Sequence, residues 1–128
     1  MSEVRALIVD DSSVMRKIVE RCLRQAGLES LVVVEAGNGV EALEQLRTAK
    51  VDLILTDINM PSMDGLELVR QIRAQDLAKG VPVIMITTES SEEQVKQAIQ
   101  AGARGYIRKP FTAGQVKERV LPLLQAAA

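Results

Sequence analysis

The 128-residue chain contains no histidine, and this absence removes several kinds of chemistry at once. A histidine general base, a histidine metal ligand and a phosphohistidine are all excluded within the chain. The chain has a single cysteine, Cys22, so an internal disulfide and a C-x-x-C metal or redox site are also excluded. Cys22 falls on the apolar face of a predicted helix, where we expect an inert core thiol.

Aromatic residues are scarce as well, since Tyr106 and Phe111 are the only two and tryptophan is absent. The core must therefore be aliphatic, and platforms for stacking nucleic-acid bases are not available. Lys and Arg total 16 and Asp and Glu total 17, a balance that argues against a nucleic-acid or anionic-membrane surface. No apolar run approaches the roughly 20 residues of a membrane span, and the first residues show no signal region. We expect a soluble, cytoplasmic protein.

Short apolar runs alternate with amphipathic helical patterns along the chain. The runs predict strands at Ala6–Val9, Leu31–Val34, Leu53–Thr56, Val83–Ile86 and Gly105–Arg108. Helical spacing predicts inner helix faces made of Val14, Met15, Ile18, Val19, Cys22 and Leu23; of Val40, Leu43 and Leu46; of Leu66, Val69 and Ile72; of Val95, Ala98 and Ile99; and of Val116, Val120 and Leu124. Continuous apolar strands with helices between them favour an α/β fold, a doubly wound (βα)5 parallel sheet in a three-layer αβα sandwich.

Four local signals refine this pattern. Ser91-x-x-Gln94 and Thr112-x-x-Gln115 resemble capping boxes and predict helix starts. Pro122 lies inside the last helical pattern, where it should kink or end the helix. Arg16 and Lys17 are expected to form a solvated helix face.

Polar and charged residues stand at the carboxyl ends of the predicted strands. The first strand is followed by Asp10 and Asp11, the third by Asp57, the fourth by Thr87, and the fifth by Lys109. Open α/β sheets bind their ligands at this edge. Three converging carboxylates repel one another, and a hard cation such as Mg²⁺ resolves the conflict. Together with a lysine and a hydroxyl donor, they are the parts needed for phosphoryl transfer to a carboxylate, with Asp57 as the predicted acceptor.

Each of these residues also has an ordinary structural explanation when taken alone. Asp10 and Asp11 fit helix capping, Asp57 fits a turn, Thr87 fits strand packing, and Lys109 fits a solvated lysine. Only their joint occurrence, on every strand that reaches the edge, favours a site.

The same residues, in the same order, resemble the receiver domain of two-component response regulators over essentially the whole chain. The matching motifs are Asp10-Asp11, Asp57, Met60-Pro61 with Met63-Asp64-Gly65, Thr87, and Lys109-Pro110-Phe111. Asp11-Ser12-Ser13-x-Met15-Arg16 and the lack of a second domain are most similar to the stand-alone chemotaxis (CheY-like) type. The resemblance implies one receiver domain over residues 1–128, with the flavodoxin-like strand order 2-1-3-4-5.

The resemblance also implies a metal site and a phosphoacceptor. Asp57 accepts the phosphoryl group, and Asp11 and Asp57 ligate Mg²⁺, for which Mn²⁺ can substitute. The main-chain carbonyl of Asn59 is a third ligand, and Asp10 acts through water.

Further residues are implied to bind the phosphate or to transmit its presence. Lys109 pairs with Asp57, Thr87 moves toward the phosphoryl oxygen, and Tyr106 moves inward behind it; the alternative for Tyr106 is a plain surface aromatic on an edge strand. The Lys109-Pro110 peptide is implied to be cis. Thr88 departs from the family, in which a small residue is usual, and puts the dephosphorylation rate in question.

The function so implied is that of a phosphoacceptor switch, which catalyses only its own phosphorylation and dephosphorylation. Its partners would be a sensor histidine kinase or phosphotransfer protein and a downstream protein such as a flagellar motor switch component. The binding face would be the fourth helix, fifth strand and fifth helix, with Lys96, Gln97, Tyr106 and Lys117 exposed. A monomer is expected.

Three alternatives remain beside this interpretation. An Mg²⁺-dependent phosphohydrolase with an aspartyl nucleophile would need a second acid two residues after Asp57, where Asn59 stands. An FMN carrier would need a hydroxyl-rich loop after the first strand, where Asp10 and Asp11 would repel a phosphate. A degenerate receiver that only binds is disfavoured by the full set of site residues. No helix-turn-helix extension is seen, so DNA binding is not expected.

Overall fold

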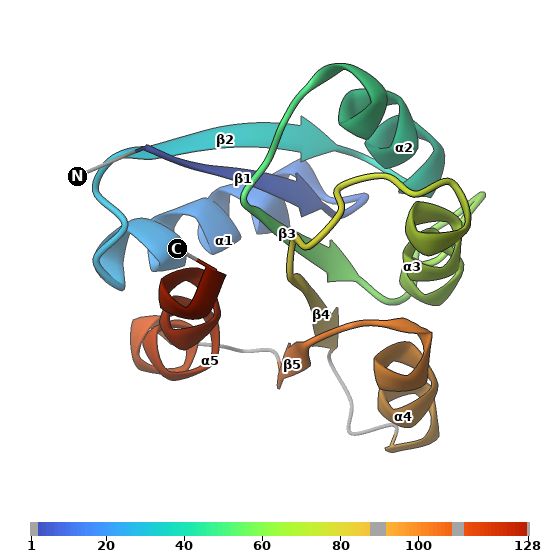
Figure 1. Ribbon diagram of the computed structural model, residues 1–128. Helices are drawn as coiled ribbons and strands as arrows, with labels where there is room; N and C mark the ends of the chain where they lie inside the picture. The colour runs from blue at the N-terminus through green and yellow to red at the C-terminus, as the bar shows by residue number, and fades with distance from the viewer. Residues whose placement is uncertain (1–2, 88–91, 109–111, 128) are drawn as a thin grey trace.

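Five strands and five helices alternate along the chain, as the hydrophobic pattern predicts (Figure 1). The computed structural model describes residues 3–87, 92–108 and 112–127. The strands are β1 (Val4–Val9), β2 (Leu31–Ala36), β3 (Leu53–Asp57), β4 (Val83–Thr87) and β5 (Gly105–Arg108). The helices are α1 (Ser13–Gln25), α2 (Gly39–Thr48), α3 (Gly65–Ala74), α4 (Glu92–Ala101) and α5 (Ala113–Ala127).

The five strands form one parallel sheet in the order β2-β1-β3-β4-β5. This confirms the expected α/β class and strand order. The central strands β1, β3 and β4 are almost wholly buried because helices cover both faces, which explains their uninterrupted apolar runs. The pairing places Val9 beside Thr56 and Asp57 beside Ile86, so the ends of these three strands lie at one edge.

Two aliphatic cores lie on opposite faces of the sheet, with α1 and α5 on one side and α2, α3 and α4 on the other (Figure 1). Alternate strand residues supply the two cores, as the period of two requires. The core under α1 and α5 includes Ile8, Leu55, Ile86, Val19, Leu23, Val116 and Val120. The other core includes Leu7, Val9, Ile54, Met85, Leu43, Leu68, Ile72 and Ala98. Cys22 is buried in the first, as expected, and burial raises the pKa of its thiol.

Some residues that the pattern assigned to inner helix faces are exposed instead. Val14 is 67% exposed, Ile18 38%, Val40 44% and Ile99 49%. Successive residues of a helix are rotated by about 100°, so an apolar stripe read from spacing alone includes positions on its flank. The side of α1 that faces the sheet is centred on Val19, Cys22 and Leu23, and Val14 and Ile18 lie beside it.

Helix ends follow the capping signals where the structure describes them. The backbone N–H of Gln115 donates to Thr112 Oγ1, and the N–H of Thr112 donates to Gln115 Oε1, both at 3.2 Å. This reciprocal pair is the predicted capping box of α5. The other predicted box begins at Ser91, which lies outside the described residues.

Pro122 lies inside α5, which continues to Ala127. Of the two expected effects of this proline, a kink or an end of the helix, the end is therefore wrong. A proline removes one backbone donor, yet Val116 and Val120 before it and Leu123 and Leu124 after it pack on the core and hold the helix together.

Among the described residues, no helix has the length and apolar character needed to cross a membrane.

Candidate functional site

The turn after β1 carries two adjacent acids that differ sharply in exposure. Asp10 continues the pairing of β1, because its N–H donates to the carbonyl of Ala36 at 3.1 Å. Its carboxylate is almost completely buried and accepts the N–H of Ser12 at 2.9 Å. Asp11, the next residue, is exposed. Ser12 then caps α1 by accepting the N–H of Met15 at 3.2 Å, so the acid turn is fixed between a strand and a helix.

Asp57 is the last residue of β3, one residue later than the sequence predicted for the end of this strand. It is paired in register with Ile86 of β4, and the N–H of Ile58 donates to Ile86 O at 3.2 Å. The partly buried Asp57 carboxylate is therefore attached to the rigid sheet and not to a free loop.

The segment after Asp57 turns back sharply, and Gly65 makes the turn possible. The N–H of Gly65 donates to Ile58 O at 2.8 Å, which brings the start of α3 against the end of β3. A Cβ atom at position 65 would lie 2.2 Å from the carbonyl oxygen of Asp57. Glycine is required at position 65 because the two backbone segments approach too closely to leave room for a side chain. Asn59 lies exposed in the loop between the end of β3 and Gly65.

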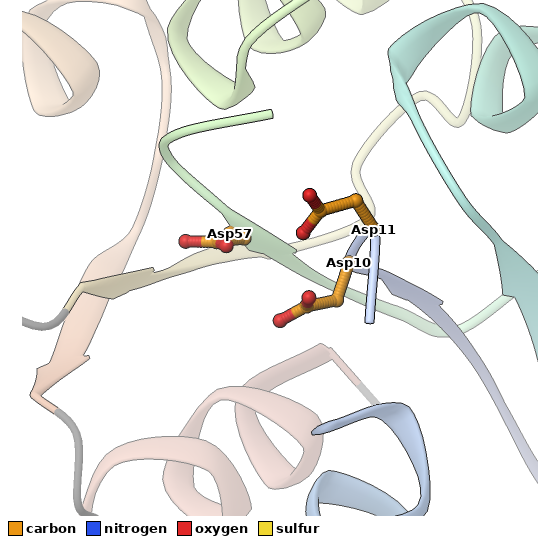
Figure 2. Close-up of side chains that lie close together, drawn as sticks. All are labelled: Asp10, Asp11 and Asp57. Carbon is orange, nitrogen blue, oxygen red and sulfur yellow. The ribbon is translucent and has the colours of Figure 1, made fainter. Parts of the chain in front are cut away.

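The three acids come together at the carboxyl edge of the sheet (Figure 2). One carboxylate oxygen from each of Asp10, Asp11 and Asp57 lies within 4.8 Å of the other two. Opposite ligands of one Mg²⁺ are separated by about 4.2 Å, so oxygens that all lie within 4.8 Å of one another are close enough to surround a single ion. Carboxylate oxygens are also the donors that this hard cation prefers. The donor set thus fits the expected metal.

Thr87 ends β4 at the same edge and is 4% exposed. It is paired in register with Arg108 of β5. The expected phosphate-binding residues Thr88 and Lys109, and the Lys109-Pro110 peptide, lie outside the described residues.

Tyr106 lies in β5 and is half-buried, packed against the core under α2, α3 and α4. The guanidinium carbon of Arg119, from α5, lies 5.5 Å from the centre of its ring, within the range of a cation–π contact. Both residues line a groove of about 250 Å³ with Arg108, Gln115 and Glu118. Of the residues expected on this face, Lys96 and Lys117 are exposed, and Gln97, like Tyr106, is partly exposed.

Arg16, expected on a solvated helix face, is turned toward the site and its side chain is only 18% exposed. Its Nη1 donates to the carbonyl oxygen of Asp10, and its Nε donates to Glu35 Oε1 at 2.8 Å. The hydrogen bond from Arg16 holds the pKa of the Glu35 carboxyl below its usual range. Sequence alone offered one signal for this contact, because Glu35 is an acid directly after the apolar run Leu31–Val34.

Comparison with known proteins gives a consistent family. The model for the response regulator receiver domain matches residues 6–121. The chemotaxis protein CheY-3 of Vibrio cholerae is 46% identical over 117 residues, which cover 91% of this chain and 88% of that protein. The chemotaxis protein CheY of Pseudomonas aeruginosa is 43% identical over 117 residues, which cover 91% and 93%.

Solved structures agree with this result. The structure of the Vibrio cholerae chemotaxis protein CheY4 is similar with a TM-score of 0.82 and 36% identity, covering 99% of this chain and all of that one. A putative response regulator from Chloroflexus aurantiacus gives a TM-score of 0.87 at 31% identity, covering 97% and 99%.

Proposed function

The chain belongs to the response regulator receiver domain family, and on this premise we propose that it is a phosphorylation-controlled switch of the stand-alone chemotaxis type. Residues 1–128 act as one receiver domain in this proposal. Asp57 accepts a phosphoryl group from the phosphohistidine of a sensor histidine kinase or phosphotransfer protein. The observation that carries the proposal is the convergence of Asp10, Asp11 and Asp57 at the carboxyl edge of the sheet.

The chemistry asks little of the protein beyond position and charge. A carboxylate oxygen of Asp57 forms a bond to the phosphorus as the bond from phosphorus to the donor nitrogen breaks, and the released imidazole takes a proton from water. Asp57 needs no general base, because an aspartate side chain attacks as the carboxylate and has no proton to lose in the step. Hydrolysis by water later returns the carboxylate and releases inorganic phosphate.

The proposed metal site uses both acid-bearing segments. Asp11 and Asp57 would hold Mg²⁺, or Mn²⁺ in its place, together with the main-chain carbonyl of Asn59, and Asp10 would act through water. When bound, the ion neutralises the negative charge that builds up between the carboxylates and the phosphoryl oxygens. Thr87 and Lys109 bind the phosphoryl oxygens, and Thr88 affects how long the phosphorylated form lasts.

The output of the switch is a change of the α4–β5–α5 face. Phosphorylation adds charge and acceptor oxygens at the edge where Thr87 ends β4, and Tyr106 lies in the neighbouring strand. Movement of these two residues alters the groove lined by Tyr106 and Arg119. Because the similar proteins are chemotaxis proteins, the proposed downstream partner is a component of the flagellar motor switch. The protein acts as a monomer.

A phosphohydrolase with an aspartyl nucleophile is the rival function. Such an enzyme needs a general acid or base near its nucleophile. Asn59 stands two residues after Asp57, where that acid would be expected, and an amide cannot exchange a proton in this way. The proposal is therefore a switch protein and not an enzyme with separate substrates.

The test is incubation with acetyl phosphate and MgCl₂, followed by intact mass measurement. Wild-type protein should gain the mass of one phosphoryl group, and the gain should require the divalent ion. Asp57→Asn should gain nothing. Asp64→Asn is the matched control, because it makes the same acid-to-amide change in the same loop, and asparagine still caps α3 as Asp64 does. No gain in the wild type, or a gain that persists in Asp57→Asn, would sink the proposal.

A further inference from the structure

The side chain of Arg16 joins three separate segments next to the acid cluster. It projects from the first turn of α1, donates through Nη1 to the carbonyl oxygen of Asp10, and donates through Nε to Glu35 of β2. With its side chain 18% exposed and two directed hydrogen bonds, Arg16 is held in one orientation. The contact therefore ties the acid turn to both the helix and the neighbouring strand.

Asp10 forms hydrogen bonds through three different groups, its N–H, its carboxylate and its carbonyl. Its N–H donates to Ala36 O at 3.1 Å, its carboxylate accepts the N–H of Ser12 at 2.9 Å, and its carbonyl accepts from Arg16. The carbonyl held by Arg16 belongs to the peptide that links Asp10 to Asp11. Its orientation sets the direction in which the exposed Asp11 side chain leaves the backbone.

Arg16 brings a positive charge close to a proposed cation site, and Glu35 faces that charge. Glu35 Oε1 lies 2.8 Å from Arg16 Nε, and Lys17 Nζ lies 3.7 Å from Glu35 Oε2. A planar guanidinium can hold a carboxylate and a carbonyl at once through donors in a fixed geometry, which a single ammonium cannot reproduce. Arg16 therefore orients the turn while its charge is engaged by Glu35.

We infer that Arg16 is a positioning residue for the proposed Mg²⁺ and phosphoryl site, and that Glu35 acts through Arg16 by fixing its guanidinium. This inference rests on the proposed function. Without Arg16, the peptide between Asp10 and Asp11 loses one of its restraints. Binding of the cation must then order Asp11, and its affinity falls.

The test is the Mg²⁺ dissociation constant, measured by calorimetry on metal-free protein. Arg16→Ala should weaken Mg²⁺ binding roughly tenfold, as loss of a group that orients a metal ligand typically does. Arg16→Lys should weaken it as well, because one ammonium cannot reach both acceptors.

Arg24→Ala is the matched control for this change. Like Arg16, Arg24 pairs with an acid and donates to a backbone carbonyl. Its partners are Glu20, at 3.0 Å in the same helix, and the carbonyl oxygen of Glu29, at 3.5 Å. Arg24 lies at the opposite end of α1 from the acids. This variant should bind Mg²⁺ like the wild type. A purely structural role for Arg16 would lower the melting temperature of Arg16→Ala and leave its Mg²⁺ dissociation constant unchanged.

The dependence on Glu35 is tested by a double-mutant cycle. Glu35→Ala should weaken Mg²⁺ binding by a smaller factor, and Arg16→Ala with Glu35→Ala should bind no more weakly than Arg16→Ala alone. Fully additive effects would overturn the action of Glu35 through Arg16.

The proposed function and this inference fail in different ways. Wild-type protein that does not bind Mg²⁺ overturns both. Wild-type binding that is lost in Asp11→Ala but kept in Arg16→Ala, or weakened equally in Arg24→Ala, overturns the inference alone.

Discussion

Asp11 is the exposed member of the acid cluster, whereas Asp10 is almost completely buried and Asp57 is part of the sheet. An exposed carboxylate contributes little to folding, so its removal separates cation binding from stability. In the metal-free protein its charge adds to the repulsion among the three acids.

Asp11→Ala should therefore remove the stabilisation that Mg²⁺ gives the folded protein. At a Mg²⁺ concentration 100 times the dissociation constant, wild type should gain about 2.7 kcal/mol, and Asp11→Ala should gain almost nothing. In the absence of Mg²⁺ the variant should be as stable as wild type or slightly more so. Thermal unfolding with and without MgCl₂ measures both effects.

Asp52→Ala is a suitable control, because Asp52 is exposed at the opposite edge of the sheet, where it accepts the N–H of Arg5 at 2.9 Å. It should keep the response of the wild type to Mg²⁺. An equal response in Asp11→Ala would refute the assignment of Asp11 as a ligand.

Glu35 makes a pH-dependent contribution through its pairing with Arg16. The pKa of its carboxyl is lowered in the folded protein from a usual value near 4.5, first by the hydrogen bond from Arg16. A group with a lowered pKa stabilises the fold above its unfolded value, and this contribution is lost as the pH falls through its folded value.

Glu35→Gln should therefore lose less stability than wild type as the pH falls from about 5 to about 3. The difference should be small, because the Glu35 side chain is 35% exposed and water screens the pair. Urea unfolding at several pH values measures it, with Glu44→Gln on the exposed side of α2 as the control. Parallel curves for wild type and Glu35→Gln would contradict the prediction.

At the level of elements, the connection between β3 and α3 depends on one close approach. The start of α3 lies so near to the end of β3 that a Cβ on Gly65 would overlap the Asp57 carbonyl oxygen, at 2.2 Å, and approach Met85 at 2.9 Å. Backbone atoms cannot move aside as a flexible side chain can, so the helix or the strand end must shift.

Gly65→Ala should therefore destabilise the protein by about 1–3 kcal/mol, the usual cost of overpacking. It should also weaken Mg²⁺ binding, because the shift acts on Asp57. Urea unfolding and metal titration measure the two effects. In contrast, Gly114→Ala in α5 meets Thr112 only at 3.7 Å and should stabilise by up to about 1 kcal/mol. Equal behaviour of the two variants would contradict the steric explanation.

Helix α5 contains an interior proline and is still continuous. Pro122 is exposed, so it contributes little to the core, while it costs the helix one hydrogen bond. Pro122→Ala should therefore raise the free energy of unfolding by about 1–3 kcal/mol. Equilibrium unfolding in urea measures the gain. A loss of stability would show that the helix needs the geometry that proline imposes.

For the whole molecule, the fold class follows from the sequence because the pattern is nearly free of ambiguity. Runs such as Leu53–Leu55 and Val83–Ile86 are apolar at every position. A short strand shows this pattern when helices cover both faces of its sheet. The order of the strands came from resemblance, since periodicity does not say which strands are neighbours. The acids were found because each stands at a strand end, and the parallel sheet brings these ends to one edge.

Other features depend on distances that a sequence does not contain. Val14 and Ile99 have the spacing of core residues and are exposed, because the direction in which a helix faces the sheet decides which side of its apolar stripe is covered. Arg16 appeared to be one charge on a solvated face, since its two acceptors are a backbone carbonyl and a strand residue 19 positions away. The sequence shows Gly65 only as the start of a helix. That a side chain cannot fit at this position follows from the location of the Asp57 carbonyl oxygen, which only the structure gives.

The gathering of the acids at one edge also makes the opposite edge a convenient place for protein engineering. There, Gly27 and Gly80 occupy turns at positive φ, and a Cβ at either position would meet nothing within 4 Å. These turns connect α1 to β2 and α3 to β4, away from the three carboxylates. A fluorophore or a peptide tag inserted beside either turn should therefore leave the sheet and the three acids undisturbed.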